Sequence, residues 1–293
     1  MTQPVWTPSI NAARLRVRCA PQEPFTLPLA IGSTPGALLQ GFFCNVLGDL
    51  GHDPERVTSS GPDWFRGPRT LRLQSLDLWS QVPLSTFEIE VRLVGREALR
   101  RREMAIETIQ TMGQRGLSIR GAGRVRFEIN RVVDEEAGTP PFWGTVNEVL
   151  VELVTPLVLR ARAGESRERV VAGPIPWGWV LGNLAYSVAA LEWQESGRTD
   201  EAAGKALCDA ARAQVQQLAE AIQPVRETLA PCDLGSRTSA TGKGEYDLVG
   251  ITGYSVVRGE LTPLAPWFHW LEHWYAGSQN AKGFGDVRVW RPG

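Results

Sequence analysis

The sequence predicts an α+β protein that consists of two related domains in tandem. The motif R-G-A-G-R-V-R-F at residues 120–127 returns as K-G-F-G-D-V-R-V at residues 282–289. A helix-like stretch precedes each copy, and an alternating apolar run follows each one. At 293 residues, the chain is long enough for two domains that each bury a core. The repeat at the end of both halves therefore indicates an internal duplication.

The first half reads as a βαββαβ unit. A helix at residues 35–50 is predicted by Ser33 or Thr34 as its cap, Pro35 in its first turn and apolar residues at helical spacing, and glycines end it. A second helix is expected from Glu97 to about residue 112. The predicted strands are 14–19, 70–78, 87–94 and one that starts at Arg124.

The second half repeats this plan with an addition. Its β-branched run predicts a long strand at 146–159, followed by a helix at 176–193. An alanine-rich segment at 199–229 reads as a helical insertion, and strand 247–258, helix 263–274 and strand 284–290 complete the set. Charge, glycine and proline cluster at 134–141, so we place the domains at 1–138 and 139–293. The prediction is two ferredoxin-like (RRM-like, βαββαβ) domains, with the helical insertion in the second.

Each Gly-x-Gly motif has two interpretations. It can be a tight turn that needs positive φ or close backbone approach. It can also form a concavity of backbone N–H groups that holds an anion. The basic residues beside the motifs, which would be phosphate partners in the second case, are Arg120, Arg124, Arg126, Lys282 and Arg288.

Composition and charge exclude some classes of protein. With 43% hydrophobic and 22% charged residues, no apolar run of membrane-spanning length and no signal-peptide pattern, we expect a cytoplasmic protein without a membrane partner. A net charge of −1 argues against indiscriminate coating of nucleic acid. Residues 92–131, however, carry ten arginines against four glutamates, which predicts a local basic face.

The cysteines and histidines show no metal-ligand pattern. Cys19, Cys44, Cys208 and Cys232 are far apart, so we expect reduced, mostly buried thiols and no metal or other cofactor. His269 and His273 stand at i and i+4, a spacing that can chelate a metal, but tryptophans are interleaved with them. That pattern favours a packed aromatic helix over a metal site. Its helical spacing also argues against a base-stacking platform, a role that Tyr254 and the tryptophans otherwise suggest.

Several segments together resemble the CRISPR-associated endoribonucleases of the Cas6 type, in the RAMP superfamily. They are L-P-L-A-I-G-S-T-P-G-A-L-L-Q-G-F-F near the start, the first Gly-x-Gly, V-T-P-L-V-L before a helix, and G-I-T-G-Y-S-V-V-R-G-E-L-T-P-L with A-G-S-Q-N-A-K-G-F-G-D-V-R-V at the end. These segments span most of the chain. No single motif decides the resemblance, which lies in their order and in the position of the last one.

The resemblance implies metal-independent cleavage of CRISPR repeat RNA in pre-crRNA. A ribose 2′-OH would attack the adjacent phosphate and leave a 2′,3′-cyclic phosphate and a 5′-OH. Family members often have a histidine just after the first helix, where this chain has His52 in G-D-L-G-H-D-P, with Asp49 or Asp53 to orient it. The implied partners are the repeat hairpin, which stays bound as crRNA, and subunits of a CRISPR interference complex.

The residues expected to bind the RNA are basic or belong to the glycine loops. Arg56, Arg120 and Lys282 are candidates for the cation near the reacting phosphate, and Arg100, Arg101 and Arg102 for a helix face that grips the hairpin stem. The full set is Arg56, Arg100, Arg101, Arg102, Arg120, Arg124, Lys282, Gly283 and Gly285.

Other interpretations stay open. His52 can be a polar loop residue at a helix C-terminus, where a cationic imidazole complements the helix dipole. The three arginines can form a solvated face. The protein can be a crRNA-binding subunit without catalysis, which the sequence separates poorly from a nuclease. A small-molecule enzyme on the same scaffold is disfavoured, because the sequence has no P-loop, nucleophile elbow or dinucleotide fingerprint.

Overall fold

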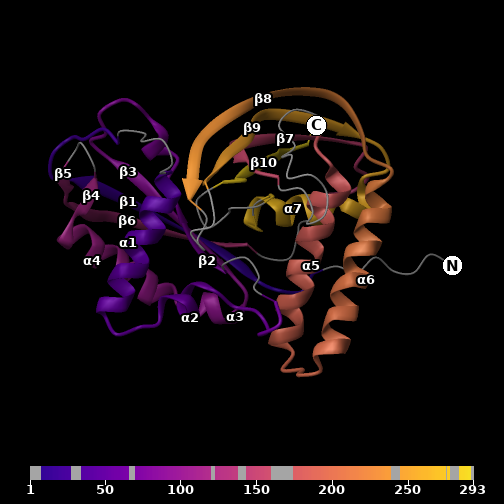
Figure 1. Ribbon diagram of the computed structural model, residues 1–293, viewed down its shortest axis with the longest axis horizontal. Coiled ribbons are helices and arrows are strands. Elements are labelled where there is room, and N and C mark those ends of the chain that lie inside the picture. Colours follow the sequence, from indigo (N-terminus) through magenta and orange to yellow (C-terminus); the bar gives the residue numbers. More distant parts are fainter. Residues whose placement is uncertain are drawn as a thin grey trace.

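The structure is a computed structural model with two four-stranded antiparallel sheets, each carrying helices on one face (Figure 1). It describes residues 8–27, 34–65, 70–119, 123–137, 143–159, 174–238, 245–274, 276–277 and 284–291. Within these ranges no helix has the length and apolar character needed to cross a membrane. The predicted domain border at 138/139 lies outside the described residues and stays a prediction.

The first half forms the sheet β2-β3-β1-β6, with a small hairpin of β4 and β5 beside it. Its elements are β1 Ala12–Pro21, α1 Pro35–Asp49, α2 Pro54–Thr58, β2 Leu71–Gln74, the 3₁₀ helix η1 Asp77–Trp79, β3 Phe87–Val94, α3 Arg96–Leu99, α4 Arg102–Arg115, β4 Leu117–Ile119, β5 Gly123–Val125 and β6 Phe127–Ala137. The strand predicted at 70–78 corresponds to β2, which already ends at Gln74 because the 3₁₀ helix η1 follows it. The helix predicted from Glu97 is two helices, because the chain turns at residues 100–101.

The second half forms the sheet β10-β7-β9-β8. Its elements are β7 Glu148–Leu157, α5 Trp177–Glu195, α6 Glu201–Ala219, β8 Gln223–Thr238, β9 Glu245–Arg258, the 3₁₀ helix η2 Thr262–Leu264, α7 Ala265–Trp274 and β10 Val287–Trp290. In both sheets the first strand of the half lies between the last and the third, which is the ferredoxin-like order. The predicted duplication is therefore confirmed at the level of topology.

The sequence prediction missed β8. It extended the alanine-rich helix to residue 229, which is wrong: α6 ends at Ala219 and β8 begins at Gln223. Pro224 and Pro231 cannot continue a helix, but an edge strand tolerates them. Most described side chains of β8 are exposed, and its leucines, Leu229 and Leu234, are only half-buried, so the strand lacks the alternating buried apolar residues by which strands are predicted. In Figure 1, β8 and β9 form a long curved pair at the edge of the sheet.

Helix α6 lies outside the six-element plan and packs along α5 (Figure 1). Asp200 caps it, because its carboxylate accepts from Ala203 N at 3.1 Å. A Cβ on Gly182 of α5 would stand 2.7 Å from Cγ of Gln216, so glycine permits the close approach of the two helices.

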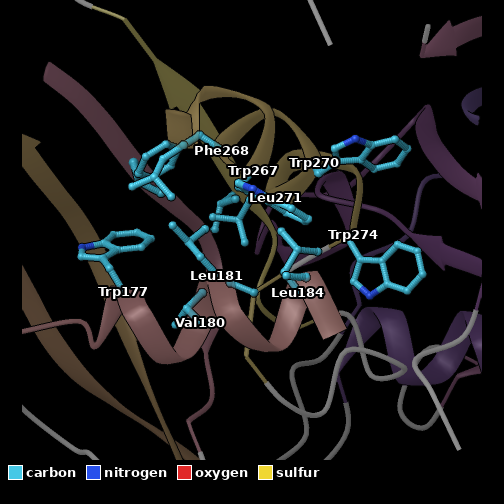
Figure 2. Packing of buried hydrophobic residues seen from close by; sticks show 14 of the residues in the cluster. Trp177, Val180, Leu181, Leu184, Trp267, Phe268, Trp270, Leu271 and Trp274 are labelled. Carbon is cyan, nitrogen blue, oxygen red and sulfur yellow. The ribbon is translucent and has the colours of Figure 1, made fainter. Parts of the chain in front are cut away.

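Each sheet covers its own apolar core. In the first half, the inward residues of β1 and β3 pack against α1 and α4. In the second half, α5 and α7 share a core rich in tryptophan, and Figure 2 shows Leu181 and Leu184 of α5 pointing toward Trp267 and Leu271 of α7. Trp267 and Trp270 are almost completely buried, which confirms the predicted packed aromatic helix.

A buried ion pair joins the two halves. Arg92 of β3 donates to Asp286, just before β10, with 2.6 Å between Nη2 and Oδ1. Gln74 Nε2 donates to the other carboxylate oxygen at 2.9 Å. Arg92 and Asp286 are each only 4% exposed, so both charges depend on these contacts for solvation.

The same face of the first sheet caps helix α7. The last carbonyls of a helix have no partner within the helix. Arg92 Nη1 donates to the carbonyl of Glu272 at 2.5 Å, and Arg72 Nη1 donates to the carbonyl of Trp274 at 2.6 Å. Both carbonyls belong to the last turn of α7, where positive charge complements the helix dipole. We call these contacts of Arg72, Gln74 and Arg92 the interdomain joint.

We expect loss of one partner of the ion pair to destabilise the protein strongly. Arg92→Met should lower the free energy of unfolding by about 3–5 kcal/mol, because it leaves Asp286 buried without its cation. Combined with Asp286→Asn, the loss should be smaller than the sum of the two single losses. Urea unfolding of the double-mutant cycle measures this. Arg100→Met, whose side chain is 67% exposed and pairs only at the surface, is the matched control. Additive losses in the cycle would contradict the pairing.

Candidate active site

His52 lies at the end of α1, and two helix caps fix its backbone. Gly51, with φ of 83°, takes the left-handed conformation that ends the helix. Gly51 N donates to Gly48 O at 3.0 Å and His52 N donates to Leu47 O at 2.9 Å, the two bonds of a Schellman motif. Asp53, the next residue, caps α2. The imidazole is exposed, so it is available to a ligand.

The two carboxylates offered as partners of His52 are engaged elsewhere. Asp53 accepts from Glu55 N at 3.0 Å and pairs with Arg56 at 3.5 Å, while Asp49 pairs with Arg115. The prediction that one of them orients His52 therefore lacks support from these contacts. The guanidinium of Arg56 projects into solvent, with its side chain 87% exposed.

A group of arginines adjoins the His52 loop. Arg115 ends α4, and its pair with Asp49 ties that end to the end of α1. The next residue, Gly116, has φ of 80° and lies under the side chains of Arg124 and Arg126, whose Cγ atoms would stand 2.6 and 3.0 Å from an added Cβ. Arg124 and Arg126 are exposed. We call Arg115, Arg124 and Arg126 the arginine cluster.

Sequence analysis did not assign Arg115 to the site. It is one of ten arginines in 92–131, and helix C-termini commonly carry a basic residue for reasons of dipole alone. Only the pairing with Asp49 shows that this helix end meets the His52 loop.

The predicted helix face of Arg100, Arg101 and Arg102 does not form, because these residues span the break between α3 and α4. Arg101 Nη1 donates to the carbonyls of Arg56 and Val57, both at 2.6 Å. Arg102 pairs with Asp134 and Glu136 of β6 at 3.0 and 3.1 Å. Arg100 pairs with Glu97 at the surface. Arg101 and Arg102 therefore hold α2 and β6 in place and do not present a joint basic surface.

The two glycine motifs have different surroundings. Arg120 of the first, and Lys282 and Gly283 of the second, lie outside the described residues. Gly285, with φ of 78°, is described: an added Cβ would stand 1.9 Å from the carbonyl of Ala276. Its N–H donates to Pro156 O at 3.0 Å. The described part of the second motif therefore has the tight-turn role of glycine, and it leads directly to Asp286 of the interdomain joint.

A polar cleft of about 370 Å³ opens beside the joint. Its lining includes Arg14, Arg16, Glu88, Glu90, Glu272 and Arg288. Arg14 lies 3.5 Å from Glu90 and Arg16 lies 4.0 Å from Glu88, so carboxylates offset these cations. Burial raises the pKa of Glu88 and of Glu272. The cleft thus attracts anions less than the arginine cluster does.

Two of the cysteines and the α7 histidines belong to packed regions, while Cys44 and Cys232 are half-buried. Cys19 and Cys208 are buried, and desolvation raises the pKa of Cys19 to about 12, so that thiol is inert. His269 and His273 have ring centroids 4.8 Å apart. Desolvation lowers the pKa of His273 to about 2 and lowers that of His269 in the same direction. Among the described residues, no group of three or more ligand side chains is placed to hold a metal ion.

Comparison with solved structures settles the fold. No family model and no curated protein matches the chain. The product complex of Cas6 TTHB231, from Thermus thermophilus, matches with a TM-score of 0.59 and 12% identity, over 96% of this chain and 99% of that one. The chain has the Cas6 fold. The product complex of Cas6 TTHA0078 matches with a TM-score of 0.55 and 15% identity, over 95% of this chain and 99% of that one. A partial Cas6-RT-Cas1–Cas2 complex matches with a TM-score of 0.56 and 10% identity, over 100% of this chain and 47% of that one.

The predicted resemblance to the Cas6 type and the prediction of tandem ferredoxin-like domains are thereby confirmed as statements about fold. At 10–15% identity, the likeness does not extend to individual residues. The roles of His52 and of the arginines stay predictions.

We expect acid to destabilise the protein through His273. Its folded-state pKa lies below the ordinary 6.5, so the unfolded chain binds an extra proton between these values and stability falls as the pH falls below about 6.5. This term is about 2 kcal/mol between pH 7 and pH 5. His269 adds to it with the same sign, and Arg14 and Arg92 face the same ring.

Urea unfolding at pH 7 and pH 5 tests this expectation. His273→Gln should reduce the loss of stability at pH 5, whereas His52→Gln, at an exposed position, should leave it unchanged. An equal loss in wild type and His273→Gln would show that other groups cause the acid sensitivity.

Proposed function

We propose that this protein is a metal-independent endoribonuclease that cleaves CRISPR repeat RNA in pre-crRNA to give mature crRNA. The observation that carries the proposal is the position of His52, exposed and fixed between two helix caps, three residues after Asp49, which pairs with Arg115 of the arginine cluster. The fold supports it, because two of the matching Cas6 structures are product complexes. Histidine and arginine supply what a phosphodiester transesterification needs without a metal.

The proposed reaction is an intramolecular transesterification. The ribose 2′-oxygen forms a bond to the adjacent phosphorus, and the bond from phosphorus to the 5′-oxygen breaks. A base takes the proton of the 2′-OH, and an acid protonates the departing 5′-oxygen. Because imidazole exchanges protons near neutral pH, we assign one of these transfers to His52.

The arginine cluster would stabilise the charge that develops on the phosphate. Arg124 and Arg126 are exposed, and Arg115 is 47% exposed in its pair with Asp49. A planar guanidinium binds two phosphate oxygens at once, which suits a phosphorane-like transition state. The predicted contributions of Arg56, Arg120 and Lys282 would add to this charge.

We propose further that the repeat hairpin stays bound after cleavage and that this complex joins subunits of a CRISPR interference complex. The tight capping of the site favours a preformed surface over one that orders on binding. The match to a structure of a Cas6-RT-Cas1–Cas2 complex is consistent with the fold acting within larger CRISPR assemblies.

We expect His52→Ala to abolish most cleavage while RNA binding persists. The protein is incubated in EDTA with the repeat RNA from its own locus, and the product ends are mapped. Wild type should make a single cut that leaves a cyclic phosphate, and His52→Ala should slow it by roughly 10²–10⁴-fold, the usual contribution of a general acid or base. Glu220→Ala, at an exposed position after α6, is the control.

The other outcomes are equally informative. Tight binding without a cut in wild type would make the protein a non-catalytic crRNA-binding subunit. A cut that persists in His52→Ala would leave the nuclease but remove His52 from its mechanism.

We expect Arg124 and Arg102 to differ in RNA binding. Arg124→Ala should weaken repeat binding and reduce the slope of log affinity against log salt by about 1, because one phosphate contact is lost. Arg102→Ala should leave the slope unchanged, since Asp134 and Glu136 already hold that guanidinium. Fluorescence anisotropy at several salt concentrations measures both slopes. Equal slope changes in the two variants would contradict the assignment of the arginine cluster.

A further inference from the structure

We propose that the open face of the second sheet is an additional RNA site, where Trp290 and Tyr254 stack unpaired bases of a single-stranded segment. The inference rests on the proposed function for the choice of RNA as ligand. It concerns a surface other than that of His52, which lies in the first half of the chain.

Strand alternation separates the two faces of this sheet. The residues that face α5 and α7 are buried, among them Val149, Val151, Val257 and Val287. Their neighbours within the strands point to the opposite face and are half-buried or exposed. In Figure 1 the helices of this half lie on one side of the sheet.

The strand register places the aromatic residues of this open face. One row across the strands runs from Trp290 through Leu150 and Val256 to Arg226. The next row runs from Arg288 through Glu152 and Tyr254 to Thr228. Trp290 and Tyr254 are therefore two strands and one row apart, roughly 12 Å between Cα atoms from standard sheet dimensions. At that separation each ring can stack its own base.

Trp290 is held with its ring accessible. Its side chain lies on the open face at the end of the edge strand β10, outside the core, and the residue is 52% exposed. Its indole N–H donates to Glu152 at 3.2 Å, which satisfies the polar atom and orients the ring. What remains open to a ligand is the apolar ring surface, which stacks any base.

The charges around the rings favour a polyanion. The guanidinium of Arg226 lies 5.6 Å from the ring centroid of Tyr254, and Arg288 is exposed beside Glu152. The two carboxylates of this face are engaged, Glu148 with Arg258 and Glu152 with the indole of Trp290. Arginines beside the exposed Trp290 and the half-buried Tyr254 suit single-stranded RNA, in which phosphates and bases alternate.

The helical spacing of the α7 tryptophans predicts burial rather than a stacking platform, and these tryptophans are buried. Trp290 follows a different pattern. It continues the alternation of V-R-V-W in β10, which places its side chain on the face of Arg288.

Binding of a 5′-fluorescein-labelled decauridylate tests the proposal, because this RNA has no hairpin to occupy the His52 site. Trp290→Ala should raise its dissociation constant by about 5- to 150-fold, the factor expected for one stacked base. Trp290→Phe should restore most of the affinity, since a stacking ring remains. Val225→Ala, an exposed apolar residue of β8, is the matched control. Thermal unfolding confirms that each variant is folded. Equal affinity of Trp290→Ala and wild type, or no binding by wild type, would overturn the proposal.

Crosslinking and cleavage separate this proposal from the proposed function. A 4-thiouridine-substituted decamer should crosslink under ultraviolet light to the peptides that carry Trp290 or Tyr254, and crosslinks confined to other peptides would overturn the proposal. His52→Ala should bind decauridylate as wild type does. Decauridylate binding without repeat cleavage would remove the nuclease but keep the stacking site. Repeat cleavage by wild type, together with unaltered decauridylate binding by Trp290→Ala, would keep the nuclease but remove the stacking site.

Discussion

The relation between the two halves depends on the buried pair of Arg92 and Asp286. Taking both charges out of water is costly unless every hydrogen bond is made, and here Glu90, Gln74 and the end of α7 supply further partners. Such a network tolerates little displacement, because a shift of an ångström leaves a buried charge unpaired. The first sheet is therefore fixed against α7 and the start of β10. The polar cleft beside the joint takes its shape from the same contacts.

This constraint explains why the two copies of the glycine motif differ. The second copy contains Asp286, which binds it to the first sheet, and its Gly285 packs against the carbonyl of Ala276. In the first copy Arg124 stands at the equivalent position, on the surface beside Arg115. The second glycine of each copy has positive φ, 76° at Gly123 and 78° at Gly285, but the residues that follow them differ. One copy organises the contact between the halves, and the other presents cations to solvent.

Local pattern predicted the elements that bury one face. Helix α1 begins at Pro35 with Thr34 as its cap, and β3 occupies residues 87–94, both as predicted, because hydrophobic period and capping specify them locally. Strand β8 was not predicted, because an exposed edge strand with two prolines does not need a periodic hydrophobic pattern. For the site, the sequence pointed to His52 and Arg124 but not to Arg115. It also did not indicate that Arg101 and Arg102 are engaged in structural contacts. Those contacts join residues more than 30 positions apart, and no local pattern records them.

Arginine performs three physical tasks in this chain, which is why its abundance alone could not locate an RNA surface. Arg72 and Arg92 are buried and cap a helix in the other half. Arg101 and Arg102 anchor α2 and β6. Arg124 and Arg288 are exposed on two different surfaces. A guanidinium can attract phosphate only where protein carbonyls and carboxylates have not already taken its donors. The distribution of engaged and exposed arginines, rather than net charge, therefore indicates where an RNA can lie on this protein.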